Sequence, residues 1–540
     1  MDHLSAAKTW LEQDPDPVTK LELKELIESK NQEELAARFG SRLEFGTAGL
    51  RGELGAGPNR MNQIVVAQTA LGIARFLKKN ESSYLDAAGQ LSVVIGYDGR
   101  VNSDVFAKLS AEVFAYEGIR AKLFSQMVPT PVAAFAGRQL SASATVVVTA
   151  SHNPPRDNGY KVYLGGENGH SQLVPPQDAQ IANEIEQIAS NTTFSEIARS
   201  DDFEYLEDSE IDAYQARALE LIGNSENLRA QRAAIKIVYT AMHGVGHRYL
   251  AEIFNSAGFQ IHSVEEQQEP DGSFPTVAFP NPEEPGAMDL SFGLAEAIAA
   301  DLVIANDPDA DRLAVGYGNP PRMLTGDQVG VLLADLMAQK GARVIANSIV
   351  SEDLSQLAEH HGIGYEQTLT GFKWISKVAN LDYGYEEALG YCVDPHYTPD
   401  KDGITAALLI AELASELRAK GKTLGDELAR LESLYGESAT GQVSIRVSDI
   451  SQIAKVMAAL RNQPPAKILD SDVAVEDYLE KTGNKKTDAL LFTGSSIKVI
   501  FRPSGTEPKL KCYLQFKGED AQNRLSELAN WAKELIAELS

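Results

Sequence analysis

Short runs of β-branched residues alternate with longer amphipathic segments through most of this 540-residue chain. Residues 91–97 and 144–149 are continuous apolar runs of the kind found in buried strands, and residues 103–117 have the spacing of a helix. The same alternation continues with apolar runs at 235–240 and 302–305. Continuous apolar strands are typical of sheets covered by helices on both faces, so the pattern predicts an α/β fold.

The pattern changes toward the C-terminus. Residues 246–257 predict a helix of a second α/β domain, whereas a strand at 343–350 and a helix at 403–420 indicate a third α/β domain. Beyond residue 440, strands at 497–501 and 511–516 precede an amphipathic closing helix, which predicts an α+β domain. The first 40 residues look helical and peripheral, and no internal repeat is evident. The expected domains are α/β domains at 1–205, 206–317 and 318–439, and a smaller α+β domain at 440–540.

Composition and charge narrow the classes of function. Hydrophobic residues are 43% and charged residues 23%, as in globular proteins, and the length exceeds what one core supports. The net charge of −27 repels polyanions, so we expect no nucleic-acid partner, and any anion site must be compact. No apolar run approaches the ~20 residues of a membrane span, and no secretory signal is evident. Cys392 and Cys512 are too few for a disulfide framework, which favours a cytoplasmic location.

The segment TASHNP at 149–154 directly follows a predicted strand and runs on to Lys161. Ser151 at the end of a strand, on a turn closed by prolines, is expected to be exposed and rigidly held, as a nucleophile or phosphate carrier requires. His152 and Lys161 could supply proton transfer and positive charge. The alternative is an ordinary Ser/Asn/Pro turn with a surface histidine.

The segment DPDADR at 307–312 also follows a predicted strand. Asp307, Asp309 and Asp311 can point at one centre, and such hard oxygen ligands select Mg²⁺ or Ca²⁺. An EF-hand loop would need glycine at its sixth position, which here is Arg312. The alternative is a solvated acidic turn.

Three weaker motifs lie in the second half of the chain. RPSGTEP at 502–508, followed by Lys511, combines a guanidinium, hydroxyls and a glycine as an anion cradle would, although a plain β-hairpin turn is the alternative. In YEEALGY at 385–391, Glu386 can accept sugar hydroxyls, and TGFK at 370–373 and Lys401 lie on either side in the sequence. Glu386 and Glu387 can equally be a solvated acidic pair.

Together these segments resemble the α-D-phosphohexomutase family. FGTAGLRG at 45–52, TASHNP, DPDADR and RPSGTEP occur in the family's order, and the resemblance covers nearly the whole chain. It implies three related α/β domains with mixed sheets and a smaller C-terminal domain around a central cleft. YEEALGY, TGFK and NGYKVY are similar to the branch that includes bacterial phosphoglucomutases, phosphopentomutases and sugar-bisphosphate synthases. Where many members have a serine two residues after the sugar-binding glutamate this chain has Ala388, so one sugar contact is missing.

The resemblance also implies roles for individual residues. Ser151 is expected to be the phosphoserine, to hold Mg²⁺ together with the three aspartates, and to lie near Arg51. His152, Lys161 and Lys401 are the candidates for proton transfer. The expected substrate-binding residues are Arg312, Thr370, Gly371, Lys373, Glu386, Ala388, Arg502, Ser504, Gly505, Thr506 and Lys511.

The implied activity is the interconversion of glucose 1-phosphate and glucose 6-phosphate, with glucose 1,6-bisphosphate as intermediate and activator. Phosphomannomutase and phosphopentomutase activities are the alternatives, followed by a sugar-bisphosphate synthase, a phosphohydrolase and a non-catalytic phosphosugar-binding protein. Phosphoserine carries about −1.5 to −2 charges at pH 7, so three aspartates beside it require a divalent cation. The sequence leaves the oligomeric state open.

Overall fold

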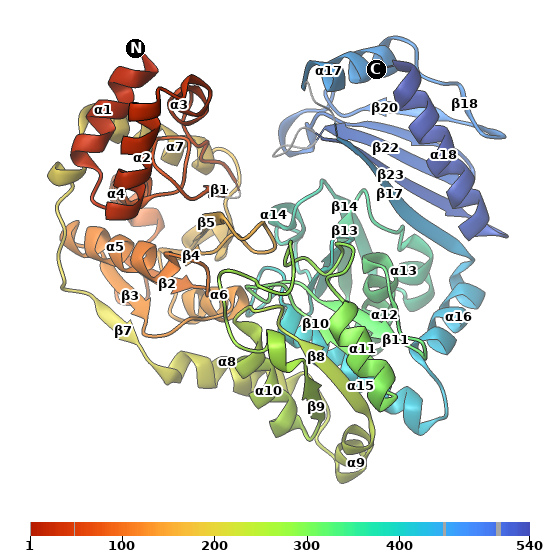
Figure 1. The fold of residues 1–540 in the computed structure, drawn as a ribbon. Helices are drawn as coiled ribbons and strands as arrows, with labels where there is room; N and C mark the ends of the chain where they lie inside the picture. Colours follow the sequence, from red (N-terminus) through yellow and green to blue (C-terminus); the bar gives the residue numbers. More distant parts are fainter. Residues whose placement is uncertain (1, 48, 447–449, 504–508, 540) are drawn as a thin grey trace. The chain divides into compact units, whose positions relative to one another are not determined.

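The computed structural model describes residues 2–47, 49–446, 450–503 and 509–539 (Figure 1). The chain divides into two compact units. The first contains Met1–Leu324, Leu381–Gly384 and Leu389–Gly421, and the second contains Thr325–Asn380, Tyr385–Ala388 and Lys422–Ser540. In the part of the chain that is described, no helix combines the length and the apolar character needed to span a bilayer.

The first unit begins with helices, as predicted. These are α1 (His3–Gln13), α2 (Pro17–Ser29) and α3 (Gln32–Phe39). Trp10, Leu23 and Leu35 from these helices are buried in one apolar core with residues of α4 (Gln63–Lys79). The N-terminal helices therefore belong to the same core as the sheet that follows, so the prediction that they are peripheral is wrong.

A mixed sheet forms the centre of this region, with the strand order β1-β5-β4-β2-β3-β7 and β6 paired to β5. Its strands are β1 (Leu50–Glu53), β2 (Ser92–Tyr97), β3 (Arg120–Phe124), β4 (Ala144–Val148), β5 (Asp157–Leu164), β6 (Ser171–Gln172) and β7 (Glu204–Leu206). Strands β4, β2, β3 and β7 are parallel, and β5 runs antiparallel to β4. The accompanying helices are α5 (Ser103–Tyr116), α6 (Thr130–Gln139), α7 (Gln177–Asn191) and α8 (Asp208–Glu220). The predicted strands at 91–97 and 144–149 and the helix at 103–117 are confirmed to within one residue.

A second mixed sheet has the order β12-β11-β10-β8-β9. Its strands are β8 (Lys236–Thr240), β9 (Gln260–Ser263), β10 (Leu302–Ala305), β11 (Ala314–Tyr317) and β12 (Arg322–Met323). The helices around it are α9 (Glu226–Ala234), α10 (Gly246–Ala257), α11 (Asp289–Ile298) and α15 (Gly403–Ala419). Strands β8, β9 and β10 are parallel and β11 is antiparallel to β10, so this sheet repeats the pairing of β2, β3, β4 and β5. The repeat is one of topology: the residues show no internal repeat, whereas the family resemblance implies related α/β domains.

The second unit contains a further α/β region. Its elements are α12 (Gly326–Gln339), β13 (Val344–Ser348), α13 (Ser355–His361), β14 (Gly364–Thr368), α14 (Phe372–Ile375) and α16 (Leu424–Tyr435). Strands β13 and β14 are parallel. Strands β15 (Tyr383–Glu386) and β16 (Gly390–Cys392) follow in the chain, so the element order of the first two α/β regions occurs a third time. The expected domain limits near residues 205, 317 and 439 stay predictions.

The C-terminal part of the second unit is an antiparallel sheet with helices, as predicted. Its strands, in the order β17-β23-β22-β21-β20, are β17 (Ser438–Arg446), β20 (Ala474–Asp477), β21 (Leu490–Thr493), β22 (Ile497–Pro503) and β23 (Lys509–Lys517). Strands β18 (Lys467–Ile468) and β19 (Ser471–Asp472) form a small ladder, and the helices are α17 (Ile450–Asn462) and α18 (Ala521–Leu539). Helix α18 lies along the sheet against β17 and β23 (Figure 1) and buries Leu525, Leu528, Ala532 and Ile536.

Candidate active site

The turn between β4 and β5 carries Ser151 in a left-handed backbone conformation, with φ at 51°. A non-glycine residue adopts this conformation only when its surroundings enforce it. Thr149 Oγ1 accepts a hydrogen bond of 2.8 Å from the Ser151 backbone N–H. Gly159 on β5 allows the close strand approach, because a Cβ there would lie 2.6 Å from the Thr149 carbonyl oxygen.

The prediction that Ser151 is exposed is wrong, because only 2% of the residue is accessible. Its hydroxyl donates a hydrogen bond of 2.6 Å to Asp307 Oδ2. The aspartate loop that buries the serine is more than 150 residues away in the sequence. The local pattern of a strand followed by a proline-closed turn therefore could not reveal this burial.

Arg100 holds the serine turn, and sequence reasoning missed it. Its guanidinium donates hydrogen bonds of 2.6–2.9 Å to backbone carbonyl oxygens of the turn, namely those of Ser151, Asn153, Pro154 and Asp157. Asp98 lies beside it, with 3.6 Å between Asp98 Oδ2 and Arg100 Nε. The available signal was the position of this aspartate and arginine directly after a buried strand.

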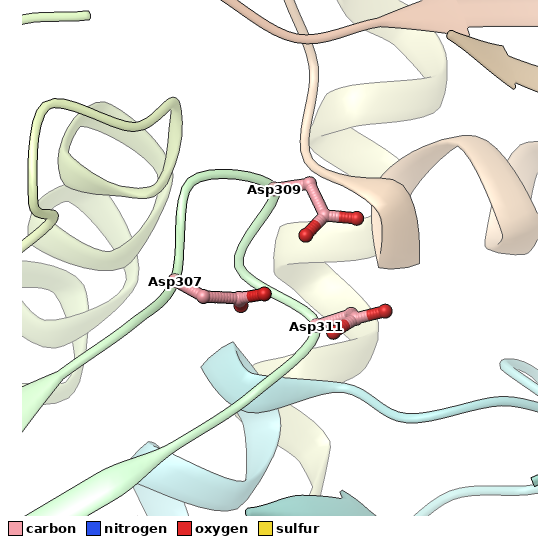
Figure 2. A group of neighbouring side chains, drawn as sticks. All are labelled: Asp307, Asp309 and Asp311. Atoms are coloured by element: carbon pink, nitrogen blue, oxygen red, sulfur yellow. The ribbon is translucent and has the colours of Figure 1, made fainter. Parts of the chain in front are cut away.

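Asp307, Asp309 and Asp311 lie on the turn between β10 and β11, and their side chains project to the same side of it (Figure 2). Each offers a carboxylate oxygen within 4.8 Å of the others, and none is more than 1% exposed. Ala310, between two of them, is left-handed, with φ at 54°. The interpretation as a solvated acidic turn is therefore wrong.

Lysines neutralise part of this carboxylate cluster. Lys161 Nζ lies 2.6 Å from Asp309 Oδ2 and 2.7 Å from Asp311 Oδ2, and Lys401 Nζ lies 3.2 Å from Asp311 Oδ2. Thr130 Oγ1 donates a hydrogen bond of 2.5 Å to Asp309 Oδ2. Burial alone raises the pKa of Asp311, but the charges of Lys161 and Lys401 more than offset it and lower the pKa.

The cluster fits a divalent cation. Among the described residues, Asp309 Oδ1 and Asp311 Oδ1 are buried without a hydrogen-bond partner. Burial, followed by the charges of Asp309 and Asp311, raises the pKa of Asp307 well above its usual range. Buried oxygen ligands that are short of positive charge suit a hard ion such as Mg²⁺.

His152, Arg51 and Arg312 complete the surroundings of the serine. His152 Nδ1 lies 3.3 Å from Ser151 Oγ, and burial together with Arg312 and Arg51 holds the pKa of His152 well below its usual value. Arg51 Nη1 donates a hydrogen bond of 2.9 Å to Asn153 Oδ1. Arg312 Nε lies 3.8 Å from Asp311 Oδ1. The structure thus brings every catalytic and metal-binding candidate, and Arg312, into one region of the first unit.

The remaining candidates belong to the second unit. Glu386 ends β15 and is 8% exposed, so the interpretation as a solvated acidic residue is wrong for it, and Ala388 follows two residues later. Arg502 on β22 and Lys511 on β23 are directly paired across the ladder. Other expected members are Thr370, Gly371 with φ at 111°, and Lys373, whose ammonium lies 5.4 Å from the Trp374 ring centre. Ser504, Gly505 and Thr506 lie outside the described residues.

Comparison with known proteins gives a consistent result. Models of the three α/β/α domains of phosphoglucomutase/phosphomannomutase match residues 42–192, 212–319 and 325–435. A probable phosphomannomutase of Haemophilus influenzae is 44% identical and the match covers 86% of this chain and 94% of that protein. The human phosphopentomutase is 34% identical, with 98% of this chain and 94% of that protein covered.

Two further similarities extend this result. A phosphoglucomutase of Staphylococcus aureus is 32% identical, and the match covers 95% of each chain. The crystal structure of a putative phosphomannomutase from Thermus thermophilus superposes with a TM-score of 0.71 at 23% identity, covering 92% of this chain and 99% of that one. The structural similarity independently supports the fold.

Proposed function

This chain belongs to the phosphoglucomutase/phosphomannomutase family of sugar-phosphate mutases, and from that premise we propose that it interconverts glucose 1-phosphate and glucose 6-phosphate. The proposed route passes through phosphorylated Ser151 and a glucose 1,6-bisphosphate intermediate. The observation that carries the proposal is the 2.6 Å hydrogen bond between Ser151 Oγ and Asp307 within the buried aspartate cluster. It brings a candidate phosphoryl carrier and a candidate cation site together.

Ser151 acts as the phosphoryl carrier in two transfers. In the first, a sugar hydroxyl oxygen bonds to phosphorus, the bond from phosphorus to Ser151 Oγ breaks, the hydroxyl loses its proton and Oγ gains one. After the bisphosphate has turned around, Oγ loses its proton and bonds to the phosphorus at the other position, the bond from that phosphorus to the sugar oxygen breaks, and the sugar oxygen gains a proton. His152 moves the proton at Oγ, because its Nδ1 lies 3.3 Å from that atom.

Positive charge at the site stabilises the transferring phosphoryl group. Lys161 and Lys401 bind the aspartate cluster, and Arg51 and Arg312 lie beside the serine turn and the cluster. Phosphoryl transfer depends mainly on positioning and on neutralising the charge of the phosphoryl oxygens. Asp307, Asp309 and Asp311, with an oxygen of phosphorylated Ser151, would hold Mg²⁺, which supplies the remaining neutralisation when bound.

The second unit supplies the proposed groups for the rest of the substrate. Glu386 accepts ring hydroxyls, and Arg502 and Lys511 bind the phosphate that is not being transferred. Ser504, Gly505 and Thr506 are proposed to add donors to that phosphate, and the segment 370–373 is proposed to line the sugar. The absence of a hydroxyl at Ala388 leaves ring recognition to fewer groups.

The experiment that tests the proposal is a panel of sugar monophosphates assayed with Mg²⁺ and a catalytic amount of the matching bisphosphate. We expect glucose 1-phosphate to be converted fastest. A much faster conversion of mannose 1-phosphate or ribose 1-phosphate would instead assign one of the activities named in the relatives at 44% and 34% identity. Inorganic phosphate released in proportion to substrate consumed would assign a phosphohydrolase.

Intact-mass measurement separates the phosphoserine from the rest of the proposal. We expect part of the isolated protein to carry one phosphoryl group that phosphatase removes and that Ser151→Ala abolishes. A phosphoryl group that persists in Ser151→Ala would contradict the assignment of the carrier.

A further inference from the structure

The loop at residues 349–352, between β13 and α13, contacts the turn that carries the proposed sugar-binding glutamate. Ser351 Oγ accepts a hydrogen bond of 3.1 Å from the Glu387 backbone N–H. The same hydroxyl donates a hydrogen bond of 3.2 Å to Glu387 Oε2. Ser351 is fully buried. One serine therefore holds both the backbone and the side chain of the residue next to Glu386.

The same loop contacts the strand that carries the proposed phosphate anchor. Lys498 Nζ donates a hydrogen bond of 2.6 Å to the Ser351 carbonyl oxygen. Lys498 lies on β22, which also carries Arg502. Ser351 is thus bonded to the sugar-binding turn through its side chain and to β22 through its backbone.

An apolar contact accompanies these bonds. Val350 is buried against Ile500 of β22 and Tyr513 of β23. The side chain of Arg502 hydrogen-bonds to Tyr513, and the charge of Glu387 adds to the effect of burial in raising the pKa of Tyr513. Tyr513 therefore lies close to both Arg502 and Glu387.

We propose that Ser351 and Lys498 are positioning residues that join the turn Tyr385–Ala388 to β22, so that the ring hydroxyls and the distal phosphate of a sugar phosphate meet one preassembled surface. This inference rests on the proposed function of Glu386 and Arg502. The turn Tyr385–Ala388 belongs to the second compact unit although its neighbours on both sides in the chain belong to the first. Both contacts of Ser351 lie within that second unit.

The inference predicts a selective effect on sugar recognition. Without the Ser351 hydroxyl, Glu387 loses these two hydrogen bonds and the orientation of Glu386 beside it is expected to change, whereas Arg502 keeps its place on β22. Ser351→Ala is expected to raise KM for the sugar phosphate ~10-fold while kcat changes less than ~3-fold, because uniform binding is lost. Competitive inhibition by inorganic phosphate, which has no ring hydroxyls, is expected to be unchanged.

Calorimetry on a Ser151→Ala background, where no transfer occurs, tests the same point without turnover. Ser351→Ala is expected to weaken the binding of glucose 6-phosphate ~10-fold and to leave the binding of inorganic phosphate unchanged. Lys498→Met is expected to weaken the binding of glucose 6-phosphate, and Lys498→Arg to bind it better than Lys498→Met does. The double variant Ser351→Ala/Lys498→Met is expected to lose less binding free energy than the sum of the losses in the two single variants. Lys517→Met is the matched control, because Lys517 binds Asp353 at 3.0 Å in the same region and contacts neither Ser351 nor Glu387 in the bonds described above.

The outcomes are distinct. Equal losses for glucose 6-phosphate and inorganic phosphate, or no loss for either, would overturn the positioning role. If Ser351→Ala unfolds at a lower temperature than Lys517→Met, the comparison of Lys498→Met with Lys498→Arg decides the question by the same criterion. A wild-type protein that converts no sugar phosphate would contradict the proposed function, whereas the calorimetric comparison would still report on Ser351 and Lys498.

Discussion

The turn between β4 and β5 and the turn between β10 and β11 occupy the same place in the four-strand pairing that the first two sheets share. Each follows a buried parallel strand and leads into an antiparallel one. Each also contains a left-handed non-glycine residue, Ser151 with φ at 51° and Ala310 with φ at 54°. The first turn presents a hydroxyl and the second presents three carboxylates, so the topology supplies the position and the residue types supply the chemistry.

The two turns differ in what supports them. Arg100 binds the serine turn through four carbonyl oxygens. The aspartate turn is held by backbone bonds, with Val245 N–H donating to the Pro308 carbonyl at 2.8 Å and Thr130 N–H to the Asp309 carbonyl at 2.9 Å. One buried arginine thus binds four carbonyl oxygens of the serine turn, whereas backbone bonds from two other segments hold the aspartate turn.

Removing the Ser151 hydroxyl from the first turn has the largest expected effect on turnover. Ser151→Ala should reduce mutase turnover at least ~10⁴-fold, because the proposed route needs Ser151 Oγ to carry the phosphoryl group. The unfolding temperature should fall by only a few degrees, since one hydrogen bond is lost. Steady-state kinetics and thermal unfolding measure both, and normal turnover would refute the role of Ser151.

Removing the proposed cation from the aspartate turn should have the next largest effect on turnover. Treatment with EDTA is expected to lower turnover ~10²–10³-fold, and added Mg²⁺ to restore it, because a hard cation neutralises the buried carboxylates. Asp309→Asn should raise the Mg²⁺ concentration needed for half-maximal activity. Full activity after exhaustive chelation would contradict a cation at this cluster.

The support of the first turn can be tested at Arg100. Arg100→Met should leave several buried carbonyl groups without donors and lower the free energy of unfolding by about 2–4 kcal/mol. Turnover should fall with it, because Ser151 is no longer held toward Asp307. Arg100→Lys should recover part of both, and equal behaviour of the two variants would show that the bonds to the turn are unimportant.

The support of the second turn can be tested at Gly244. A Cβ on Gly244 would lie 2.3 Å from Pro308 Cα, so Gly244→Ala must shift the aspartate turn and should cost about 1–3 kcal/mol of stability. The Mg²⁺ requirement should rise as well. Gly293→Ala, in helix α11 with open space around the added methyl, is the control and should stabilise slightly. If the Mg²⁺ requirement of Gly244→Ala is unchanged, the packing of Gly244 against Pro308 does not support the aspartate turn.

The turn after β15 extends the comparison to a third α/β region, and it too contains a left-handed residue, Leu389 with φ at 63°. Glu352 follows Ser351 in the loop at residues 349–352. Burial, and then the charge of Asp327, raise the pKa of Glu352 to about 7. A carboxyl whose pKa is higher in the folded than in the unfolded protein stabilises the fold most at low pH, so stability should fall between pH ~4.5 and 7. Glu352→Gln should remove most of that fall, about 2–3 kcal/mol, in unfolding experiments from pH 5 to 8. An unaltered pH profile would contradict the raised pKa.

The elements of the fold were largely readable from local pattern. The strand at 302–305 and the helix at 246–257 have the predicted bounds, because long apolar or amphipathic segments carry their own periodicity. The motifs of the candidate site were readable too, since each combines unusual residue types in a few positions directly after a strand. The expected fold class and family follow from these features and are confirmed.

Tertiary structure decided what surrounds those residues. Ser151 is buried rather than exposed because Asp307 comes from another sheet, and the hydrogen bonds of Arg100 and Ser351 join segments that lie far apart in the sequence. Pairing order leaves only a weak trace in residue identity, so the repeat was implied by the family resemblance and not by any internal repeat of the sequence. The sequence by itself determined the elements and the reactive groups, which depend on neighbours along the chain. The structure alone decided the burial of these residues, the support of the two turns and the bonds of Ser351 to Glu387 and Lys498, which depend on contacts between distant residues.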